Sequence, residues 1–472
     1  MEHPNAYRGR QVVILGLARS GVAVAKLFHD AGAFVTVNDK KERQLCPEAD
    51  ELSALGISVV CGSHPAGLIH EGIALVVKNP GIPYTIEPIQ RAMHLNIEIV
   101  TEVEVAYHIC EAPIIGITGS NGKTTTTTWT GLMLEAGGLK PIVAGNIGRA
   151  LTEAALTATS DNRMVVELSS FQLKGTSAFR PRIGCLLNVY ETHLDYHDTM
   201  EDYIDSKVKL FANQTKSDTA VLNWDAPICR DIAQKVNASV LPFSTKSVLD
   251  YGFYVQPPLA DEQDDIARML VYRDAQGQVS PIMPAGELGI PGTFNMENAL
   301  AASAMAYTAG VPLHTIAEVL RSFRGVEHRL ESVAEHNGVH FYNNSKATNP
   351  TATVKTIEAF KQDIILIAGG LDRGSDYMDL LPVFQRQVKG LVAFGETKEK
   401  IARVARLAGL SQVKTVDTAN NVQDTVDEAV RAALAMAKPG NVVLLSPACA
   451  SWDMFPSYEE RGRMFRQSVH NL

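Results

Sequence analysis

The residues from Gly116 to Thr126 read Gly-Ile-Thr-Gly-Ser-Asn-Gly-Lys-Thr-Thr-Thr and follow the apolar run Ala112-Pro113-Ile114-Ile115. A buried strand that enters a glycine-containing turn and then a helix is the build of a phosphate-binding loop, because backbone N–H groups and the positive end of the helix dipole face an anion. Lys123 is expected to reach the outer phosphates, and the Thr124 hydroxyl to hold Mg²⁺. The sequence therefore predicts a chain that uses a nucleoside triphosphate.

The spacing of this loop departs from the commonest form, G-x-x-x-x-G-K-[ST]. The position five residues before Gly122 is Ile117, with Gly116 and Gly119 on either side of it. An ordinary strand–turn–helix with a chance Gly-Lys pair is the alternative interpretation. The phosphate loop is favoured because strand, glycines, lysine and threonine follow one another in the required order.

Two further side chains with possible metal-binding chemistry follow predicted strands. Glu167 ends the apolar strand at 164–166, where open α/β sheets bind ligands, and it could hold Mg²⁺ beside the loop. An edge carboxylate that faces water is the alternative. His193 follows the strand at 183–188 and could bind a second metal ion or a substrate oxygen, but taken alone it fits a structural histidine better.

Two lysines are ambiguous from spacing alone. Lys207 lies in Tyr203-Ile204-Asp205-Ser206-Lys207, where nothing separates it from a solvated helix lysine. Lys346 lies among polar residues between a strand and a helix, with Asn349 as the expected N-cap and Pro350 at the first helical position. This segment fits either a capped loop or an anion site, and the segment 446–451 is a similar loop after a strand.

Strand and helix patterns alternate along the whole chain. In the first segment, strands at 12–15 and 34–37 flank a helix with apolar residues at i, i+3, i+4 and i+7, which is a βαβ opening. Further strands are expected at 73–78, 97–100, 114–118, 164–167, 183–188, 220–223, 364–368, 391–394 and 442–445, with C-terminal helices at 351–360, 398–408 and 421–437.

This alternation predicts an α/β protein with three domains. We expect a Rossmann-like parallel sheet at 1–103, a central P-loop mononucleotide-binding sheet at 104–325, and a C-terminal Rossmann-like α/β domain at 326–472. The stretch 246–292, rich in proline and glycine, is interpreted as short antiparallel strands that form a small β extension of the central domain.

The N-terminal turn allows a rival interpretation. Gly16-x-Ala18-x-x-Gly21 followed by Asp39 resembles a dinucleotide fingerprint, but Ala18 replaces the glycine at which the backbone approaches a pyrophosphate. A nicotinamide-dependent oxidoreductase is therefore one alternative, although it leaves Lys123 without a role. A non-catalytic P-loop switch or binding module is another.

The bulk composition excludes several classes. With 46% hydrophobic and 20% charged residues the chain is typical of a soluble globular protein, and its 472 residues are too many for one core. The net charge of −9 argues against a nucleic-acid surface. Six scattered cysteines form no C-x-x-C pair, and neither a signal peptide nor a long apolar run occurs. We therefore expect a cytoplasmic protein without membrane insertion.

Several of these segments together resemble the motifs of the Mur ligase family, the ATP-dependent amide-forming enzymes of peptidoglycan precursor synthesis. The resemblance runs from about residue 8 to the C-terminus. Within the family, Ser345–Asn349, Leu445–Asp453 and the short N-terminal βα domain favour the member that adds D-glutamate to UDP-N-acetylmuramoyl-L-alanine, and the Asp-Asn-Pro-Arg signature of the diaminopimelate-adding member is absent. A sister Mur-type ligase or a folylpolyglutamate-type amide ligase is the alternative. The segments are Gly116–Thr126, Glu167–Gln172, Asn188–Asp195, Asn295-x-x-Asn298-Ala299, Gly325–Arg329, Asn343–Asn349 and Leu445–Ser451.

The resemblance implies roles for individual residues. Catalytic roles fall on Lys123, Glu167, His193, Lys207 and Lys346, and metal-ligand roles on Thr124, Glu167, His193 and Lys207 as a carbamate. The implied ATP-binding residues are Gly119, Ser120, Asn121, Gly122, Lys123, Thr124, Thr125, Asn295, Asn298, Arg329 and Asn344. Those for the UDP-substrate are Leu17, Ala18, Arg19, Asp39, Lys40, Gly81, Asn146, Ser169, Gln172 and His193. Those for D-glutamate are Lys346, Thr348, Arg373, Ser451 and Tyr458.

Three positions depart from the family pattern. Phe294 stands where many members have histidine, Asn344 where relatives often have aspartate, and Arg373 where some have lysine. A guanidinium can bind a carboxylate through two hydrogen bonds, so the role of Arg373 is kept.

The resemblance also implies a mechanism and its cofactors. The alanyl carboxylate attacks the γ-phosphate of ATP to give an acyl phosphate, and the amine of D-glutamate then displaces phosphate. ATP and Mg²⁺ are the implied cofactors, with two ions expected and Mn²⁺ as a possible substitute. The implied partners are small molecules only, with no nucleic acid, and the chain is expected to act as a monomer.

Overall fold

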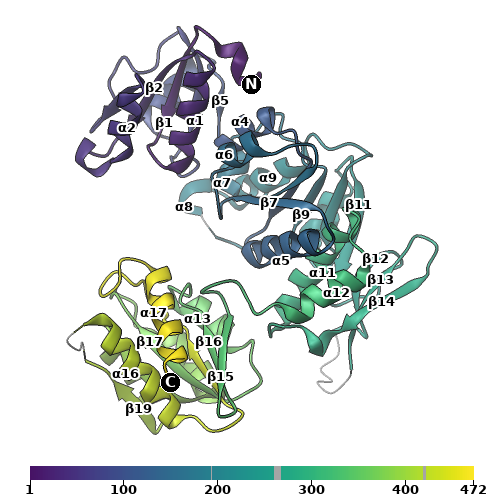
Figure 1. The fold of residues 1–472 in the computed structure, drawn as a ribbon, viewed down its shortest axis with the longest axis vertical. Helices are drawn as coiled ribbons and strands as arrows, with labels where there is room; N and C mark the ends of the chain where they lie inside the picture. Colours follow the sequence, from purple (N-terminus) through teal and green to yellow (C-terminus); the bar gives the residue numbers. More distant parts are fainter. Residues whose placement is uncertain (193, 260–266, 418–420) are drawn as a thin grey trace. The chain divides into compact units, whose positions relative to one another are not determined.

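The structure is a computed structural model that describes residues 1–192, 194–259, 267–417 and 421–472. It contains three mainly parallel sheets covered by helices, so the prediction of a three-domain α/β protein is confirmed (Figure 1). Contacts group the chain into two compact units, one of 1–287 with 296–320 and the other of 288–295 with 321–472. The boundaries at 103 and 325 stay predictions.

The N-terminal sheet is fully parallel and has the strand order β3-β2-β1-β4-β5. The chain moves in one direction from β1 to β3 and then returns to the other side of β1. The carboxyl ends of β1 and β4 therefore flank a topological switch point, which is where open α/β sheets bind ligands. The strands are β1 (Gln11–Leu15), β2 (Phe34–Asp39), β3 (Ser58–Cys61), β4 (Ile73–Lys78) and β5 (Ile99–Val100), and the helices α1 (Arg19–Asp30), α2 (Glu48–Ala54), α3 (Glu87–His94) and α4 (Glu102–Ile109).

The central sheet has the order β14-β13-β12-β11-β10-β9-β6-β8-β7. Strands β6 to β12 pair in parallel, whereas β12–β13 and β13–β14 are antiparallel, which confirms the β extension and shows that it continues the same sheet. The strands are β6 (Ile114–Thr118), β7 (Lys140–Gly145), β8 (Asn162–Glu167), β9 (Ile183–Leu186), β10 (Thr219–Asn223), β11 (Ser239–Ser244), β12 (Gly252–Gln256), β13 (Met269–Arg273) and β14 (Val279–Pro284). The helices are α5 (Lys123–Ala136), α6 (Leu151–Thr157), α7 (Ser170–Lys174), α8 (Leu194–His197), α9 (Met200–Val208), α10 (Pro227–Ala233), α11 (Thr293–Thr308) and α12 (Leu313–Ser322).

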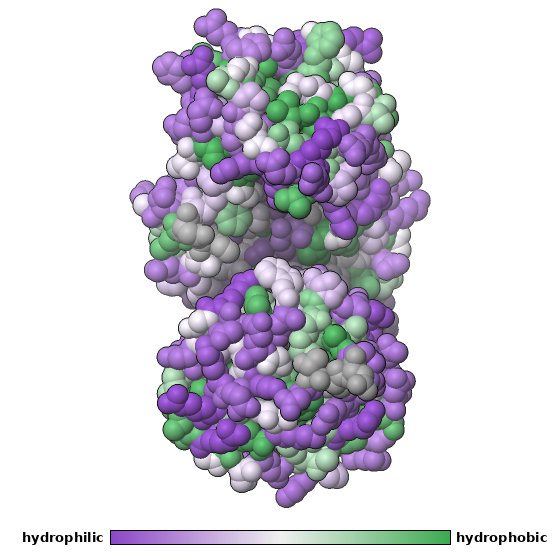
Figure 2. Space-filling view, turned by 90° about the vertical axis from the view of Figure 1, so that its left-hand side faces the viewer, coloured by the Kyte–Doolittle hydropathy of each residue, from purple (hydrophilic) through white to green (hydrophobic). Residues whose placement is uncertain are grey.

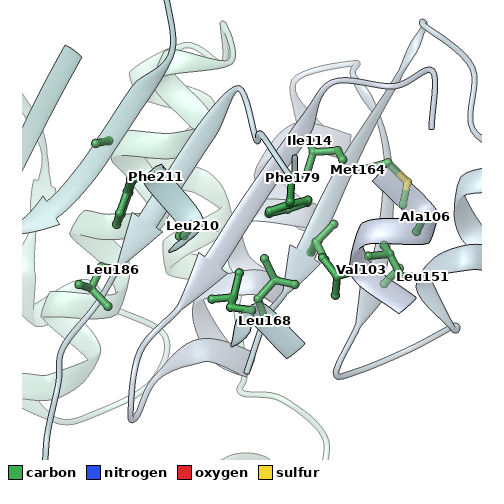
Figure 3. Close-up of a cluster of buried hydrophobic side chains, with 14 of the residues drawn as sticks. Val103, Ala106, Ile114, Leu151, Met164, Leu168, Phe179, Leu186, Leu210 and Phe211 are labelled. Atoms are coloured by element: carbon green, nitrogen blue, oxygen red, sulfur yellow. The ribbon is translucent and has the colours of Figure 1, made fainter. Parts of the chain in front are cut away.

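A hydrophobic cluster on one face of this sheet holds the phosphate-loop strand in place. Figure 3 shows Ile114 of β6 and Met164 of β8 beside Val103 and Ala106 of α4. The helix α4 thus packs its apolar side on the central sheet, although it directly follows the N-terminal sheet in the chain. Burial of these side chains anchors β6, the strand that leads into the loop at 119–122.

The C-terminal sheet has the order β15-β16-β20-β17-β18-β19, parallel except for β15–β16. Asn349 caps α13 through its side chain and Pro350 opens that helix, as predicted. The strands are β15 (Glu331–His336), β16 (Val339–Asn343), β17 (Ile364–Gly369), β18 (Val388–Phe394), β19 (Gln412–Thr415) and β20 (Val442–Leu445). The helices are α13 (Pro350–Ile357), α14 (Leu381–Gln387), α15 (Lys398–Leu407), α16 (Val422–Met436) and α17 (Tyr458–His470).

The face of the molecule drawn in Figure 2 mixes residue types, with hydrophobic residues interspersed among hydrophilic ones. Among the described residues, no helix combines the length and the apolar composition that crossing a membrane requires.

Candidate active site

The predicted phosphate loop lies between β6 and α5 and is closed by a side chain from β9's carboxyl end. Asn188 accepts a hydrogen bond from the Asn121 N–H at 2.9 Å through its Oδ1, and its backbone oxygen accepts one from the Ser120 N–H at 3.0 Å. Gly122 begins α5 with φ +83°, and a Cβ there would lie 2.2 Å from Oδ1 of Asn298. Glycine is therefore required at 122 both by backbone conformation and by the closeness of Asn298.

Two lysines meet at one carbonyl of this loop. The Lys123 ammonium donates to the Gly119 oxygen at 2.8 Å and to the Ser120 oxygen at 3.1 Å. The Lys207 Nζ, from α9, lies 2.9 Å from the same Gly119 oxygen. The loop thus gathers two basic groups where the sequence predicts the triphosphate.

Lys207 is buried, with only 1% of its surface exposed, so its interpretation as a solvated helix lysine is wrong. Its Nζ lies 4.6 Å from the centre of the Tyr203 ring, one helical turn earlier on α9. Burial, and then repulsion by Lys123, lower the pKa of Lys207 to about 6. An amine with this pKa is mostly uncharged at neutral pH, and an uncharged amine is a nucleophile.

Glu167 lies at the carboxyl end of β8 and is 2% exposed, so the alternative of a carboxylate facing water is wrong. Its Oε1 accepts a hydrogen bond from Nδ2 of Asn146 at 2.9 Å. Its Oε2 is buried without a hydrogen-bond partner among the described residues. An orphaned carboxylate oxygen beside a phosphate loop fits a hard cation such as Mg²⁺, and the adjacent β6 strand carries the loop with Thr124.

The remaining predicted metal ligand cannot be placed. His193 lies outside the described residues. The described part of the chain contains no group of three or more histidine, cysteine, aspartate or glutamate side chains that could hold a metal ion.

The other predicted ATP-binding residues fall at different places. Asn298 contacts the loop region, with Oδ1 3.3 Å from the Thr126 hydroxyl. Thr125 is buried in the first turn of α5. Asn295 and Arg329 belong to the other compact unit. In that unit Asn344 is occupied internally: its amide donates to the Thr356 hydroxyl at 2.7 Å and its Oδ1 accepts from the Leu330 N–H.

The residues predicted for the UDP-substrate lie at the carboxyl ends of two sheets. On the N-terminal sheet, Asp39 accepts hydrogen bonds from the Leu17 and Lys41 N–H groups, and thereby fixes the turn after β1. Ala18 is the N-cap of α1 without a side-chain cap, and Arg19 opens that helix. Lys40 and Gly81 are exposed at the same edge.

The central sheet contributes the others. Asn146 follows β7 and holds Glu167. Ser169 and Gln172 form the capping box of α7, in which each side chain satisfies a backbone N–H of the other. Both side chains are therefore engaged in starting a helix.

The residues predicted for D-glutamate lie at strand-end loops of the C-terminal sheet. The Lys346 Nζ lies 3.0 Å from the Tyr458 hydroxyl and 4.8 Å from its ring centre. Arg373 stacks over the exposed Trp452 ring at 5.0 Å. Ser451 is buried in the loop after β20, and Thr348 is half-buried before α13.

The sequence reasoning missed side chains that support these groups. Tyr203 lies four residues before Lys207, and this spacing on a helix is the sequence signal that places its ring beside the lysine. Arg461 on α17 is 1% exposed and donates to Ser345 Oγ and to the backbone oxygens of Ser345 and Cys449. It ties together the loops that carry Lys346 and Ser451, and no sequence signal marked it.

Comparisons with known proteins cover the whole chain. Family models match at 10–101 (Mur ligase MurD-like, N-terminal domain), 117–306 (Mur ligase middle domain) and 328–449 (Mur ligase, glutamate ligase domain). The UDP-N-acetylmuramoylalanine--D-glutamate ligases of Geobacillus sp. (strain WCH70) and Bacillus subtilis (strain 168) are 47% and 44% identical over 473 aligned residues, and 100% of both chains is covered in each case.

A solved structure shares the fold. The UDP-N-acetylmuramate-alanine ligase of Thermotoga maritima is 17% identical with a TM-score of 0.58, and the match covers 98% of this chain and 99% of that one. Family models across all three sheets and full-length relatives at this identity leave one assignment: the chain belongs to the Mur ligase family of ATP-dependent amide-forming ligases.

Proposed function

We propose that this chain uses ATP to join D-glutamate to UDP-N-acetylmuramoyl-L-alanine, releasing ADP and phosphate during peptidoglycan precursor synthesis. The observation that carries this proposal is the full-length match to relatives that are named for this activity. The nicotinamide-dependent oxidoreductase and the non-catalytic module are set aside, because the family assignment spans the N-terminal turn and the P-loop alike.

The step in which a carboxylate attacks ATP needs positive charge close to the phosphates. Two unit negative charges about 4 Å apart repel by roughly 4 kcal/mol at an effective dielectric constant of 20, and a carboxylate that attacks a triphosphate brings several such pairs. Lys123 and the first backbone N–H groups of α5 offset this repulsion. Lys123 therefore acts as the phosphate-binding cation once its ammonium turns from the Gly119 and Ser120 carbonyls to the nucleotide.

The lysine on α9 is proposed to become a carbamate. The uncharged Lys207 amine attacks the carbon of CO₂: an N–C bond forms, one C–O π bond breaks with its electron pair moving to oxygen, and the nitrogen loses a proton to water, so that a buried base becomes a carboxylate. With the orphaned Oε2 of Glu167, this carboxylate supplies the anionic oxygens that Mg²⁺ prefers. Bound Mg²⁺ would neutralise phosphate charge, and Thr124 and His193 complete the proposed ligand set, with a second ion and Mn²⁺ as a substitute proposed from the resemblance.

We propose that D-glutamate binds at the strand-end loops of the C-terminal sheet. Lys346 and Arg373 supply the positive charges for the two carboxylates of D-glutamate, and Ser451 and Thr348 supply hydroxyl groups. The Tyr458 hydroxyl and ring hold the Lys346 ammonium in place. A dicarboxylic amino acid is the substrate that such a pair of cations favours.

We also propose a compartment and an oligomeric state. We propose that the enzyme works in the cytoplasm, because its six cysteines are all free, as in reducing compartments. We propose that it acts as a monomer, since the single chain carries every residue assigned above.

The proposed function is tested by phosphate release with ATP, UDP-N-acetylmuramoyl-L-alanine and a panel of D- and L-amino acids. We expect phosphate release and amide formation with D-glutamate and little turnover with L-glutamate. Preference for another amino acid would assign the chain to a sister ligase. ATP hydrolysis that ignores both substrates would contradict the ligase proposal.

A further inference from the structure

A second buried lysine lies far from the phosphate loop in the sequence. Lys78 ends β4, and only 1% of its surface is exposed. Its Nζ donates to the Pro80 oxygen at 3.1 Å and to the Tyr196 hydroxyl at 3.0 Å, while the Tyr196 hydroxyl donates to the same Pro80 oxygen at 3.0 Å. A buried ammonium without a carboxylate is costly, and among the described residues none pairs with Lys78.

The groups around Lys78 leave its charge without a negative partner. The Tyr84 and Tyr196 rings lie 4.6 Å and 5.7 Å from its Nζ. The nearby carboxylate, Asp202, is engaged by Lys174 at 2.6 Å and by His197 at 2.7 Å. Burial, and then the repulsion of Lys174, lower the pKa of Lys78 to about 7. An arriving anion would therefore strengthen the protonated state of this lysine.

The carbonyl that Lys78 holds determines where a neighbouring N–H points. The Pro80–Gly81 peptide is trans, so the Gly81 N–H is directed away from the Pro80 oxygen. With that oxygen bound by an ammonium and a phenol, the N–H faces outward at an exposed glycine. It donates to the Asn79 side-chain oxygen at 3.3 Å, a long hydrogen bond that an anion can replace.

This N–H faces the switch point of the N-terminal sheet. The turns after β1 and β4 touch, since a Cβ on Gly16 would lie 2.8 Å from Cβ of Asn79. The turn after β1 leads directly into α1, whose N-cap Ala18 offers no side-chain cap, so the first N–H groups of a twelve-residue helix are available. Helix N–H groups, the Gly81 N–H and the Lys78 charge below it thus surround the same crevice.

We propose that Lys78 and Tyr196 are positioning residues that aim the Gly81 N–H at the pyrophosphate of the UDP-substrate, and that the Lys78 charge stabilises this anion from beneath the turn. This inference rests on the proposed function. Tyr196 comes from α8 of the central domain, so the pair also fixes the turn of the N-terminal sheet against the domain that carries the ATP site.

The test is steady-state kinetics of the full-length enzyme with Lys78→Met, which keeps the length of the side chain and removes its charge. We expect KM for UDP-N-acetylmuramoyl-L-alanine to rise about tenfold or more, while KM for ATP and for D-glutamate stays within about twofold. We also expect Tm to stay equal or rise, since a buried unpaired charge is replaced by an apolar chain. A lysine that only supported the fold would lower Tm instead.

Two variants complete the experiment. Tyr196→Phe keeps the ring and removes the hydroxyl, and we expect a smaller rise of about threefold in the same KM. Lys26→Met is the matched control, because Lys26 lies on α1 in an exposed pair with Glu51, and no KM should change. An unchanged KM for the UDP-substrate in Lys78→Met, or an equal rise for all three substrates with a lower Tm, overturns the inference. Failure of the wild-type enzyme to use this substrate would instead refute the proposed function.

Discussion

Lys78 and Lys207 are each 1% exposed, each lies near at least one tyrosine ring and each has a lowered pKa, but their polar neighbours differ. Lys78 donates to an oxygen pair, Pro80 O and Tyr196 Oη, and its like-charged neighbour Lys174 is paired with Asp202. Lys207 shares its carbonyl with a second lysine, Lys123.

From this difference in neighbours we infer that Lys78 acts as a cation, whereas Lys207 acts as an uncharged amine. The Lys78 Nζ lies near the Tyr84 and Tyr196 rings, and both oxygens to which it donates are neutral. Burial and the adjacent Lys123 ammonium lower the pKa of Lys207, which favours the uncharged amine that the proposed carbamate requires. Burial alone therefore does not decide what a lysine does; its neighbours do.

The largest effect is expected for Lys123→Ala. This change removes the ammonium beside Lys207, which has no counterpart in the hydrogen bonds of Lys78. ATP-dependent phosphate release should fall by about 10³-fold or more, because the phosphates lose their fixed cation. Binding of the UDP-substrate, measured by calorimetry, should be nearly unchanged. Phosphate release at the wild-type rate would refute the role of the phosphate loop.

Lys207→Ala should be almost as damaging, with activity lowered by about 10³-fold. Because the proposed product of Lys207 is a carboxylate, short carboxylic acids such as acetate should restore part of the activity. Lys78→Met, which also removes a buried lysine, should gain nothing from acetate. If acetate restored activity to both variants, or to neither, the proposed difference between Lys207 and Lys78 would be refuted.

The supply of CO₂, from which the proposed carbamate forms, is expected to affect activity less than the two lysine substitutions do. With ¹³C-labelled bicarbonate, NMR should show one carbamate signal that persists in Lys78→Met and disappears in Lys207→Ala. Because the Lys207 pKa is lowered to about 6, its amine is uncharged above that pH and protonated below it, so the signal and the activity should both decline as the pH falls through about 6. Full activity in bicarbonate-free buffer would count against the carbamate.

The smallest effect is expected for Tyr203→Phe. This change keeps the ring over Lys207 and removes the hydroxyl that lies 2.8 Å from Ser120 Oγ. We expect a loss of about 1 kcal/mol in the free energy of unfolding and activity within about threefold of wild type. Tyr84→Phe provides the counterpart at Lys78 and should be closer to neutral. A loss of carbamate signal in Tyr203→Phe would mean that the hydroxyl, not the ring, controls Lys207.

The same two lysines show what sequence can and cannot provide. The strand, glycines and lysine of 114–123 were predicted because phosphate loops need them in a fixed order, and β6 and α5 lie where expected. Lys207 was placed in the site only by family resemblance, because a helical lysine carries no local mark of burial. Lys78 was missed inside a correctly predicted strand, since the Tyr196 that covers it lies 118 positions later.

Two strands of the central sheet, β7 and β11, were not predicted from the sequence, although both extend the sheet in parallel. Each strand contains a proline, Pro141 in β7 and Pro242 in β11, and a proline within an apolar run argues against a strand when only the local pattern is considered. The Arg461 contacts with the loops at 345 and 449 arise only when strand ends from separate parts of the sequence meet.

The bonds that Lys123 makes to the Gly119 and Ser120 carbonyls have a consequence for nucleotide affinity. Contact of this ammonium with ATP exchanges these two hydrogen bonds for new ones to phosphate oxygens. We therefore expect Lys123 to contribute less to the affinity for ATP than to the rate of phosphoryl transfer, in which negative charge accumulates on the transferred group.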